Sequence, residues 1–143
     1  MLTLPNGFGQ NATDISYCFS NTRIIVITLP DGFGQNAINI SWCFNGCMNT
    51  MELTLPNGFG QNATNLDYCF DGCGMLTDIT GNPNFKVSLD LSSCPLTHDS
   101  IMVVINGLQT VTETQTLTLG STNLAKLTDE EKQIATDKGW TLA

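Results

Sequence analysis

The sequence predicts an α/β repeat protein, a right-handed solenoid with one parallel sheet, short helical turns in its N-terminal coils and longer helices in its C-terminal coils. Three near-copies of one stretch of eighteen residues lead to this prediction, because they begin at Leu2, Ile27 and Leu53, in steps of 25 and 26 residues. A period in the twenties is typical of leucine-rich repeats, whose coils bury their apolar side chains only by stacking. The 143 residues fit a single domain. We divide it into repeats at about 2–26, 27–52 and 53–75, an irregular coil at 76–87, and strand-helix capping coils at 88–143.

Each copy reads as a strand, a turn and a short helical segment. Residues 25–29 and 51–55 alternate apolar and polar side chains, as a strand with one buried face does. A proline then ends the strand pairing, and the glycines of an Asn/Asp-Gly-Phe-Gly turn follow. Apolar residues next recur at i, i+3 and i+7, which predicts one apolar face of a helical turn. These residues are Ala12, Ile15 and Phe19, then Ala37, Ile40 and Phe44, then Ala63, Leu66 and Phe70.

The second half of the sequence predicts longer coils than the three repeats do. Residues 88–92 and 116–120 have the same strand alternation, and residues 140–142 predict a last short strand. Between the halves, Leu76 and Ile79 mark a shorter coil whose turn lies at 81–84. We therefore expect five or six strands in one parallel sheet.

Two helices are expected in this half. The first runs from about Thr97, its N-cap, to Leu108, with Ile101, Val104 and Ile105 on its apolar side. The second begins at Thr128, which is followed three residues later by a glutamate as in a capping box. It should end near Gly139, a residue type favoured just after a helix.

Composition excludes some partners. The chain has 5 Lys and Arg residues against 13 Asp and Glu, and its basic residues are scattered. Nucleic acid and anionic membranes are therefore poor partners, because both require clustered positive charge. The longest apolar run, residues 101–105, is too short to span a bilayer. Met1 is followed directly by a strand pattern, and no signal peptide is visible.

The repeat unit resembles a known family. The stretch from Leu53 to Cys73 has the Leu-Thr-Leu-Pro strand and the Cys-Phe-x-Gly-Cys ending of the BspA-type bacterial leucine-rich repeats. Residues 88–97, 117–127 and 134–140 are similar to the closing segment of such proteins in gut bacteria and their phages. The resemblance covers nearly the whole chain and implies a leucine-rich-repeat fold. It also implies a surface, adhesion-like or phage-tail protein, located on a cell surface or a virion.

The cysteines and the single histidine are weak candidates for chemistry. Cys18, Cys43 and Cys69 share one repeat position and Cys47 and Cys73 another, so they should stack about 5 Å apart as buried free thiols, although a Cys47–Cys73 disulfide remains open. No CxxC motif occurs, and we expect no metal and no cofactor. His98 lies at an expected helix start, without a visible nucleophile and base beside it. We therefore predict that the chain is not an enzyme.

Two sets of side chains are candidates for binding. The column of Tyr17, Trp42 and Tyr68 reads either as an exposed recognition stripe or as the outer edge of the core, and the second reading is favoured because stacked repeats usually bury aromatic residues. The second set consists of polar strand positions that should share one concave face. Its members are Thr3, Val26, Thr28, Glu52, Thr54, Asp90, Thr116 and Thr118.

The first coil should expose a strand edge and apolar side chains. We expect an upstream segment, a second copy of the chain or another protein to cover this N-terminal end. The sequence therefore favours a recognition or adhesion module that binds a protein or glycan through the solenoid face. A structural subunit of a virion, tail or filament, assembled through the open end, is the alternative.

Overall fold

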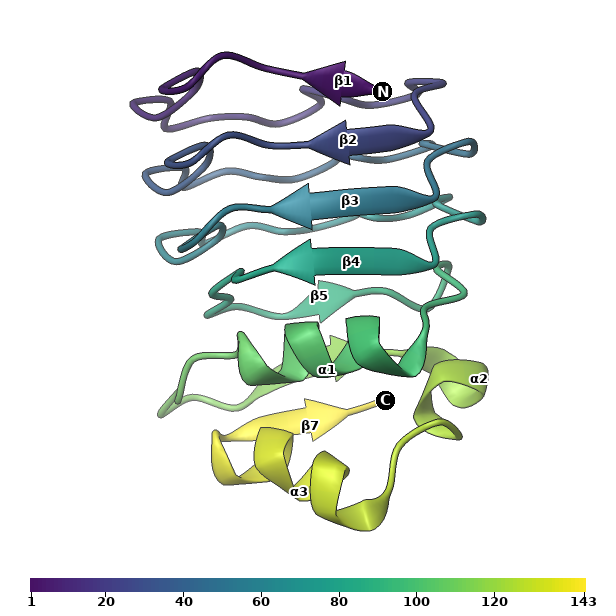
Figure 1. Ribbon diagram of the computed structural model, residues 1–143. Coiled ribbons are helices and arrows are strands. Elements are labelled where there is room, and N and C mark those ends of the chain that lie inside the picture. The colour runs from purple at the N-terminus through teal and green to yellow at the C-terminus, as the bar shows by residue number, and fades with distance from the viewer.

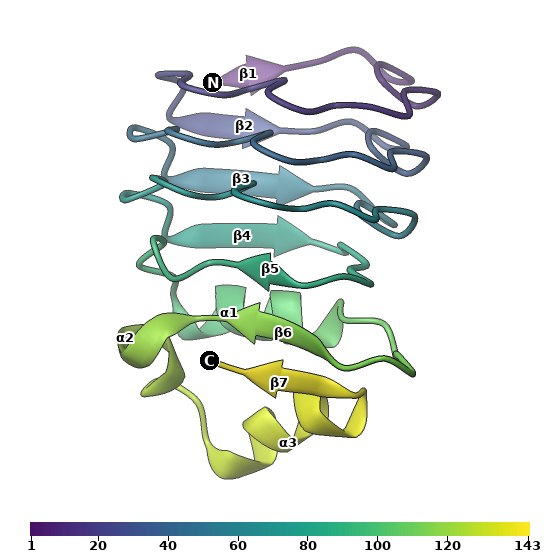
Figure 2. The same cartoon turned by 180° about the vertical axis from the view of Figure 1, so that it is seen from behind.

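The protein is a stack of coils with one parallel sheet on each of two opposite faces (Figures 1 and 2). The structure is a computed structural model and describes residues 1–143. The front face, seen in Figure 1, carries β1 (Leu2–Thr3), β2 (Val26–Thr28), β3 (Glu52–Leu55) and β4 (Asp78–Gly81). The rear face, seen in Figure 2, carries β5 (Leu89–Asp90), β6 (Gln115–Thr118) and β7 (Trp140–Leu142).

The three sequence copies form consecutive layers of the front sheet. Leu2 pairs with Ile27, Ile27 with Leu53, and Leu53 with Ile79, so the 25- and 26-residue steps are the register of the sheet. The expected shorter coil at Leu76 and Ile79 supplies β4, which continues the register of the front sheet as its fourth strand. Parallel pairing and stacked layers were therefore predicted correctly.

The prediction of a single sheet is wrong, because the strands form two sheets. From Leu53 to Ile79 the chain advances 26 residues, a full coil, whereas from Ile79 to Leu89 it advances only 10 residues. That half coil brings β5 to the rear face, where full steps resume from Leu89 to Leu117 and on to Leu142. The alternating pattern of residues 88–92 identified a strand but carried no information about which face the strand occupies.

A helix takes the next front position below β4. Helix α1 (His98–Asn106) packs there, and the buried Ser100 Oγ accepts a hydrogen bond from the Ile79 N–H at 2.9 Å. The Thr97 N–H donates to the carbonyl of Thr77 at 2.9 Å. Helix α1 thus occupies the outer edge of β4, and the front sheet ends at four strands.

Both predicted helices are present with the predicted caps. The Thr97 side chain caps α1, and Thr128 forms the capping box of α3 (Asp129–Asp137) with Glu131. The short helix α2 (Gly120–Leu124) was not predicted, because its N-cap residue, Leu119, makes no side-chain capping bond. No helix is both long and apolar enough to cross a membrane.

The expected helical turns of the repeats are wrong. The rear segment of each of the three repeats is a run of tight turns, and those of the first two repeats donate backbone hydrogen bonds to the next coil. Ile15, Tyr17 and Phe19 donate to the carbonyls of Asn39, Ser41 and Cys43 at 3.0, 3.2 and 2.8 Å. In a helix these N–H groups would point along the helix axis and could not reach the neighbouring coil. The predicted apolar positions still face the core, because the turns repeat their direction at a similar spacing.

Columns of identical residues fill the core. Phe19, Phe44 and Phe70 stack with ring centroids 5.4 and 5.5 Å apart. All six cysteines are free; of the five expected to be buried, Cys43, Cys47, Cys69 and Cys73 are buried, whereas Cys18 is exposed. The thiols of Cys47 and Cys73 each donate to the carbonyl of the stacked phenylalanine one coil earlier, at 3.1 Å. These cysteines therefore serve as small apolar groups that also join layers.

Candidate functional site

The predicted binding residues divide between the two faces. Thr28, Glu52 and Thr54 belong to β2 and β3 on the front face. Asp90, Thr116 and Thr118 belong to β5 and β6 in the rear sheet. The expectation that all of them share one face is therefore wrong, and the cause is the half coil between β4 and β5. The rear sheet residues instead adjoin the aromatic column.

The aromatic column is exposed. Tyr17 and Tyr68 are 58 % and 56 % exposed, and Trp42 between them is half-buried. The rings stack face to face, with centroids 5.7 Å apart for Tyr17 and Trp42 and 4.4 Å apart for Trp42 and Tyr68. The favoured reading of this column as the outer edge of the core is wrong, because Phe19, Phe44 and Phe70 occupy the core instead. We call Tyr17, Trp42 and Tyr68 the rear aromatic row.

The backbone of the row is strained. Tyr17, Trp42 and Tyr68 have φ values of 58°, 60° and 56°, in the left-handed region that bulky side chains rarely adopt. Such a conformation costs about 1 kcal/mol or more at each residue. Glycine would avoid this cost, and the chain uses glycine at other positive-φ positions such as Gly46 and Gly72. The aromatic side chains are therefore kept at positions where the backbone conformation alone would favour glycine.

A hollow of about 430 Å³ lies at the end of the row, between the third coil and the rear sheet. Leu66, Asp67, Tyr68 and Asp71 of the third coil form one wall, and residues of β5, β6 and their flanks form the rest. The latter are Ser88, Leu89, Asp90, Ser93, Thr116 and Thr118. Its volume falls in the range of small-ligand sites.

The hollow exists because the backbone hydrogen bonds that join the rear turns of successive coils stop there. In the second coil, Trp42 and Phe44 donate their N–H groups to Asp67 and Cys69 at 2.9 Å. The equivalent N–H groups of Tyr68 and Phe70 have no protein acceptor. The fourth layer replaces the run of turns with the extended strand β5, whose longer rise per residue does not match the donor spacing of the turns.

Sequence reasoning missed four polar residues of this hollow: Asp67, Asp71, Ser88 and Ser93. One signal was present. The second copy reads Ile-Ser-Trp-Cys-Phe-Asn and the third reads Leu-Asp-Tyr-Cys-Phe-Asp, so only the copy nearest the rear sheet carries acidic residues at both positions. The carboxylates of Asp67, Asp71 and Asp90 take part in none of the ion pairs of the protein.

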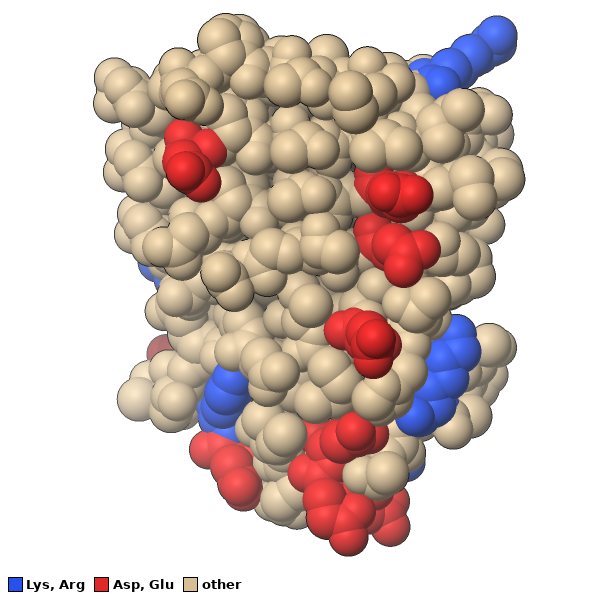
Figure 3. All heavy atoms as spheres, viewed as in Figure 1, with Lys and Arg blue, Asp and Glu red and all other residues tan.

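The front-face residues form no comparable site. Thr28 and Glu52 are exposed on the sheet surface, and the Thr54 hydroxyl is bonded to that of Thr80 at 3.0 Å. Figure 3 shows separate acidic side chains over the strands of this face, which include Glu52 of β3 and Asp78 of β4, and a larger group of them toward the end that holds α3. Thr28 and Thr54 follow the ordinary preference of threonine for strand positions at a sheet surface.

A larger hollow of about 530 Å³ is lined by residues 61–62, 83–84 and 106–110, but it has few groups suited to binding or catalysis. Its nine lining residues include amides and no ionisable or aromatic side chain. Several of these amides are used inside the fold: Gln61 and Asn62 donate to the carbonyl of Gln35, and Gln109 donates to that of Gln61. We therefore place the candidate site on the rear face.

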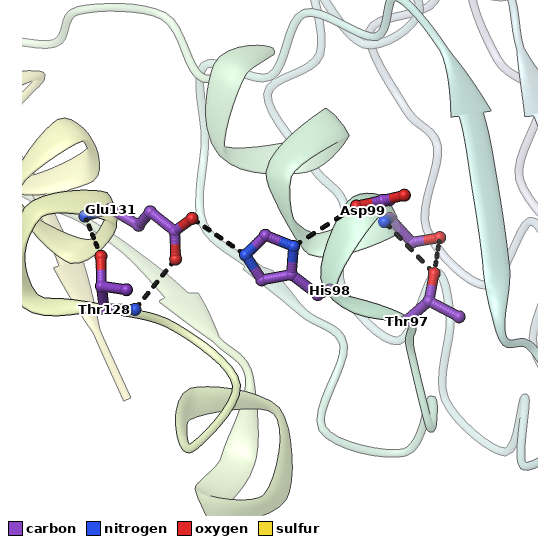
Figure 4. A network of polar contacts seen from close by, with 6 residues as sticks. Thr97, His98, Asp99, Thr128 and Glu131 are labelled. Carbon is purple, nitrogen blue, oxygen red and sulfur yellow. Dashed lines mark hydrogen bonds and ion pairs between the residues drawn. The ribbon is translucent and has the colours of Figure 1, made fainter.

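His98 joins two helices (Figure 4). Its Nε2 lies 2.9 Å from Glu131 Oε1, and its Nδ1 lies 3.4 Å from Asp99 Oδ1. Glu131 also accepts the Thr128 N–H at 2.9 Å as part of the capping box of α3. The hydrogen bond to Glu131, followed by that to Asp99, raises the pKa of His98 above its usual 6.5. The bond from the Thr128 backbone, followed by that from His98, lowers the pKa of Glu131 below its usual 4.5.

The contact between His98 and Glu131 should make the stability of the fold depend on pH. A raised His98 pKa stabilises the fold fully below 6.5, and this contribution is lost as pH rises through the folded pKa. A lowered Glu131 pKa stabilises the fold above 4.5, and this contribution is lost as pH falls through the folded pKa. Urea unfolding should therefore show that His98→Gln lowers stability more at about pH 5.5 than at about pH 9. An equal loss at both pH values would contradict the charged contact, and Lys86→Gln is the matched control for removing an unpaired positive charge.

No group of three or more His, Cys, Asp or Glu side chains is placed to hold a metal ion. Comparison of the chain with protein-family models, curated proteins and solved structures found no match. Its function must therefore be argued from the rear face itself.

Proposed function

We propose that this chain is a non-catalytic recognition module of the right-handed leucine-rich-repeat type, which binds a protein or glycan on a cell surface through its rear face. The observation that carries the proposal is the rear aromatic row. Its three aromatic side chains are exposed or half-buried, stacked in register and held in a strained backbone conformation. Strain of this kind concentrates at functional sites.

Aromatic residues suit recognition because they offer a large contact area with few rotatable bonds. The repetition of the coil places three of them in one line, and the stack limits their motion before a partner arrives. A pre-ordered surface loses less conformational entropy on binding than a mobile one does. The row is therefore both exposed and ordered, a combination that suits a binding surface.

The proposal is tested by binding of the intact chain to an array of glycans and a panel of immobilised cell-surface proteins. We expect wild type to bind at least one member, and the double variant Tyr17→Gly/Tyr68→Gly to lose that binding. Glycine suits a left-handed backbone position, so this variant should remain folded. The front-face variant Thr28→Ala/Thr54→Ala is the matched control and should bind as wild type does. Binding lost in the front-face variant and kept in the rear variant would overturn the proposal.

A structural subunit is a second candidate, favoured by the outer edge of β1. No strand of the protein pairs with that edge, and Met1 and Phe8 near it are 90 % and 46 % exposed. Unpaired strand edges readily pair with another chain. Assembly through this edge requires a mass in solution that grows with concentration, measured by light scattering. A constant monomer mass would exclude it and leave the recognition module.

A further inference from the structure

The hollow between the third coil and the rear sheet has the composition of a sugar site. We propose that it binds one uncharged pyranose ring of a glycan, stacked on Tyr68; this inference rests on the proposed function and specifies its ligand. Three features of the hollow favour a sugar: the free ring face of Tyr68, the hydrogen-bonding groups around it and the sign of the local charge.

Tyr68 ends the rear aromatic row. One face of its ring packs on Trp42 at 4.4 Å, and the ring also lines the hollow, whose other walls lie in the next layers of the stack. The face that points away from Trp42 is therefore turned toward the hollow. A pyranose ring has a flat face of C–H groups, which packs on an aromatic face, and a rim of hydroxyl groups. Tyr17, at the other end of the row, is not followed by a comparable hollow.

Free acceptors surround this ring. The Asp67 carboxylate makes no side-chain hydrogen bond, and only one oxygen of Asp90 is used, by Ser92. The hydroxyls of Thr116 and Thr118 also have no partner in the protein. Asp71 is partly used, since it accepts from Asn45 at 3.4 Å and from Ser93 at 3.3 Å. The hollow therefore offers carboxylate and hydroxyl oxygens to donors on a ligand.

Free donors lie beside these acceptors. The Leu66 and Tyr68 N–H groups have no protein acceptor, although the equivalent groups of the first two coils donate to the next coil. A lysine or arginine side chain would satisfy the carboxylates but carries no acceptor for these N–H groups. A hydroxyl group both donates and accepts, so a ring that carries several hydroxyls can satisfy both sets. This mixture of donors and acceptors is the reason that we assign a sugar and not a cation.

Local charge selects among sugars. Asp67, Asp71 and Asp90 line the hollow, and no lysine, arginine or histidine does so. A uronic or sialic acid would bring a further carboxylate toward these three, and like charges at short range repel. An uncharged hexose or N-acetylhexosamine avoids this repulsion and keeps the same hydroxyl rim. The hollow should therefore discriminate against acidic sugars.

The test is a fluorescence titration of the intact chain. Trp42 touches Tyr68, and the other tryptophan, Trp140, is 2 % exposed, so a ligand at the hollow should change the signal of Trp42. The probes are the methyl glycosides of glucose, galactose, mannose and N-acetylglucosamine, with methyl glucuronide and N-acetylarginine amide for comparison. We expect saturable binding of at least one uncharged glycoside, with a dissociation constant of about millimolar size, as a single small ring provides. Methyl glucuronide should bind at least about tenfold more weakly.

Variants assign the signal to the hollow. Tyr68→Gly and Thr118→Val should each weaken binding of the same glycoside, the first by about tenfold or more. Thr54→Val, on the front face, should leave it unchanged. Absence of binding by every uncharged glycoside, binding that survives Tyr68→Gly, or preference for N-acetylarginine amide would each overturn the sugar assignment. Such a result would leave the proposed function standing if the panel still showed binding that depends on the rear aromatic row.

Discussion

Replacing Phe44 with alanine is expected to lower the free energy of unfolding by about 3–5 kcal/mol. Phe44 is 1 % exposed and stacks between Phe19 and Phe70 in the middle layer of the repeats. It also contacts Phe59 at a centroid distance of 6.3 Å, so the lost ring would leave a cavity with aromatic walls on several sides. Neighbouring coils are joined by backbone hydrogen bonds and cannot easily collapse into that space. Urea unfolding followed by circular dichroism measures the loss.

The matched control is Phe8→Ala. Phe8 occupies the first coil, is 46 % exposed and stacks on Phe33 at 6.3 Å. The substitution removes the same atoms as Phe44→Ala, but from a side chain that is already nearly half exposed to water, so the loss should be about 1 kcal/mol or less. Equal losses at the two positions would show that the phenylalanine column is not the centre of the core. If Phe44→Ala does not fold, Phe44→Leu provides a smaller change whose loss should still exceed that of Phe8→Ala.

Replacing Gly81 with alanine is expected to cost about 3 kcal/mol or more. Gly81 ends β4 with φ at 98°, and an added Cβ would lie only 1.8 Å from the Leu55 carbonyl oxygen. That carbonyl is main chain and also accepts the Asn82 N–H at 3.3 Å, so it cannot move away as a flexible side chain could. The added methyl group must therefore separate β3 from β4 at the point where they pair.

Gly74→Ala is the control for Gly81. At Gly74 an added Cβ meets no atom within 4 Å, and its φ does not lie in the positive range. Its substitution should change the free energy of unfolding by no more than about 0.5 kcal/mol, because the new methyl group is unhindered. The two variants are compared by the same urea unfolding. A loss at Gly81 as small as that at Gly74 would contradict the close approach of the two strands.

The sequence predicted the layers better than their faces. Periodicity located the first three front layers, because each repeat carries the same strand. The caps at Thr97 and Thr128 located two helices, since capping is local chemistry. The position of β5 depends on a count of residues between strands and on α1 occupying the front, which are properties of the assembled stack. The sequence predicted helical turns on the rear face because side chains return to the same direction every few residues in tight turns as well as in a helix.

The sequence named some of the residues of the candidate site but not their grouping. Tyr17, Trp42 and Tyr68 stood out as a column, but their outward direction follows from a left-handed backbone that no residue preference suggests. Asp90, Thr116 and Thr118 were assigned to the front because the pattern of one strand does not distinguish two sheets. The hollow itself arises from a mismatch between turns and an extended strand, and only the assembled layers show such a mismatch.

The central claim is that the rear aromatic row is kept for recognition and not for stability. The most direct measurement is binding of the Tyr17→Gly/Tyr68→Gly variant to the glycan and cell-surface protein panel, with its free energy of unfolding measured beside it. Relief of backbone strain should offset the lost stacking and the flexibility of glycine, so stability should stay within about 1 kcal/mol of wild type while binding is lost. A loss of stability as large as that of Phe44→Ala, with binding retained, would contradict the claim and make the row part of the core.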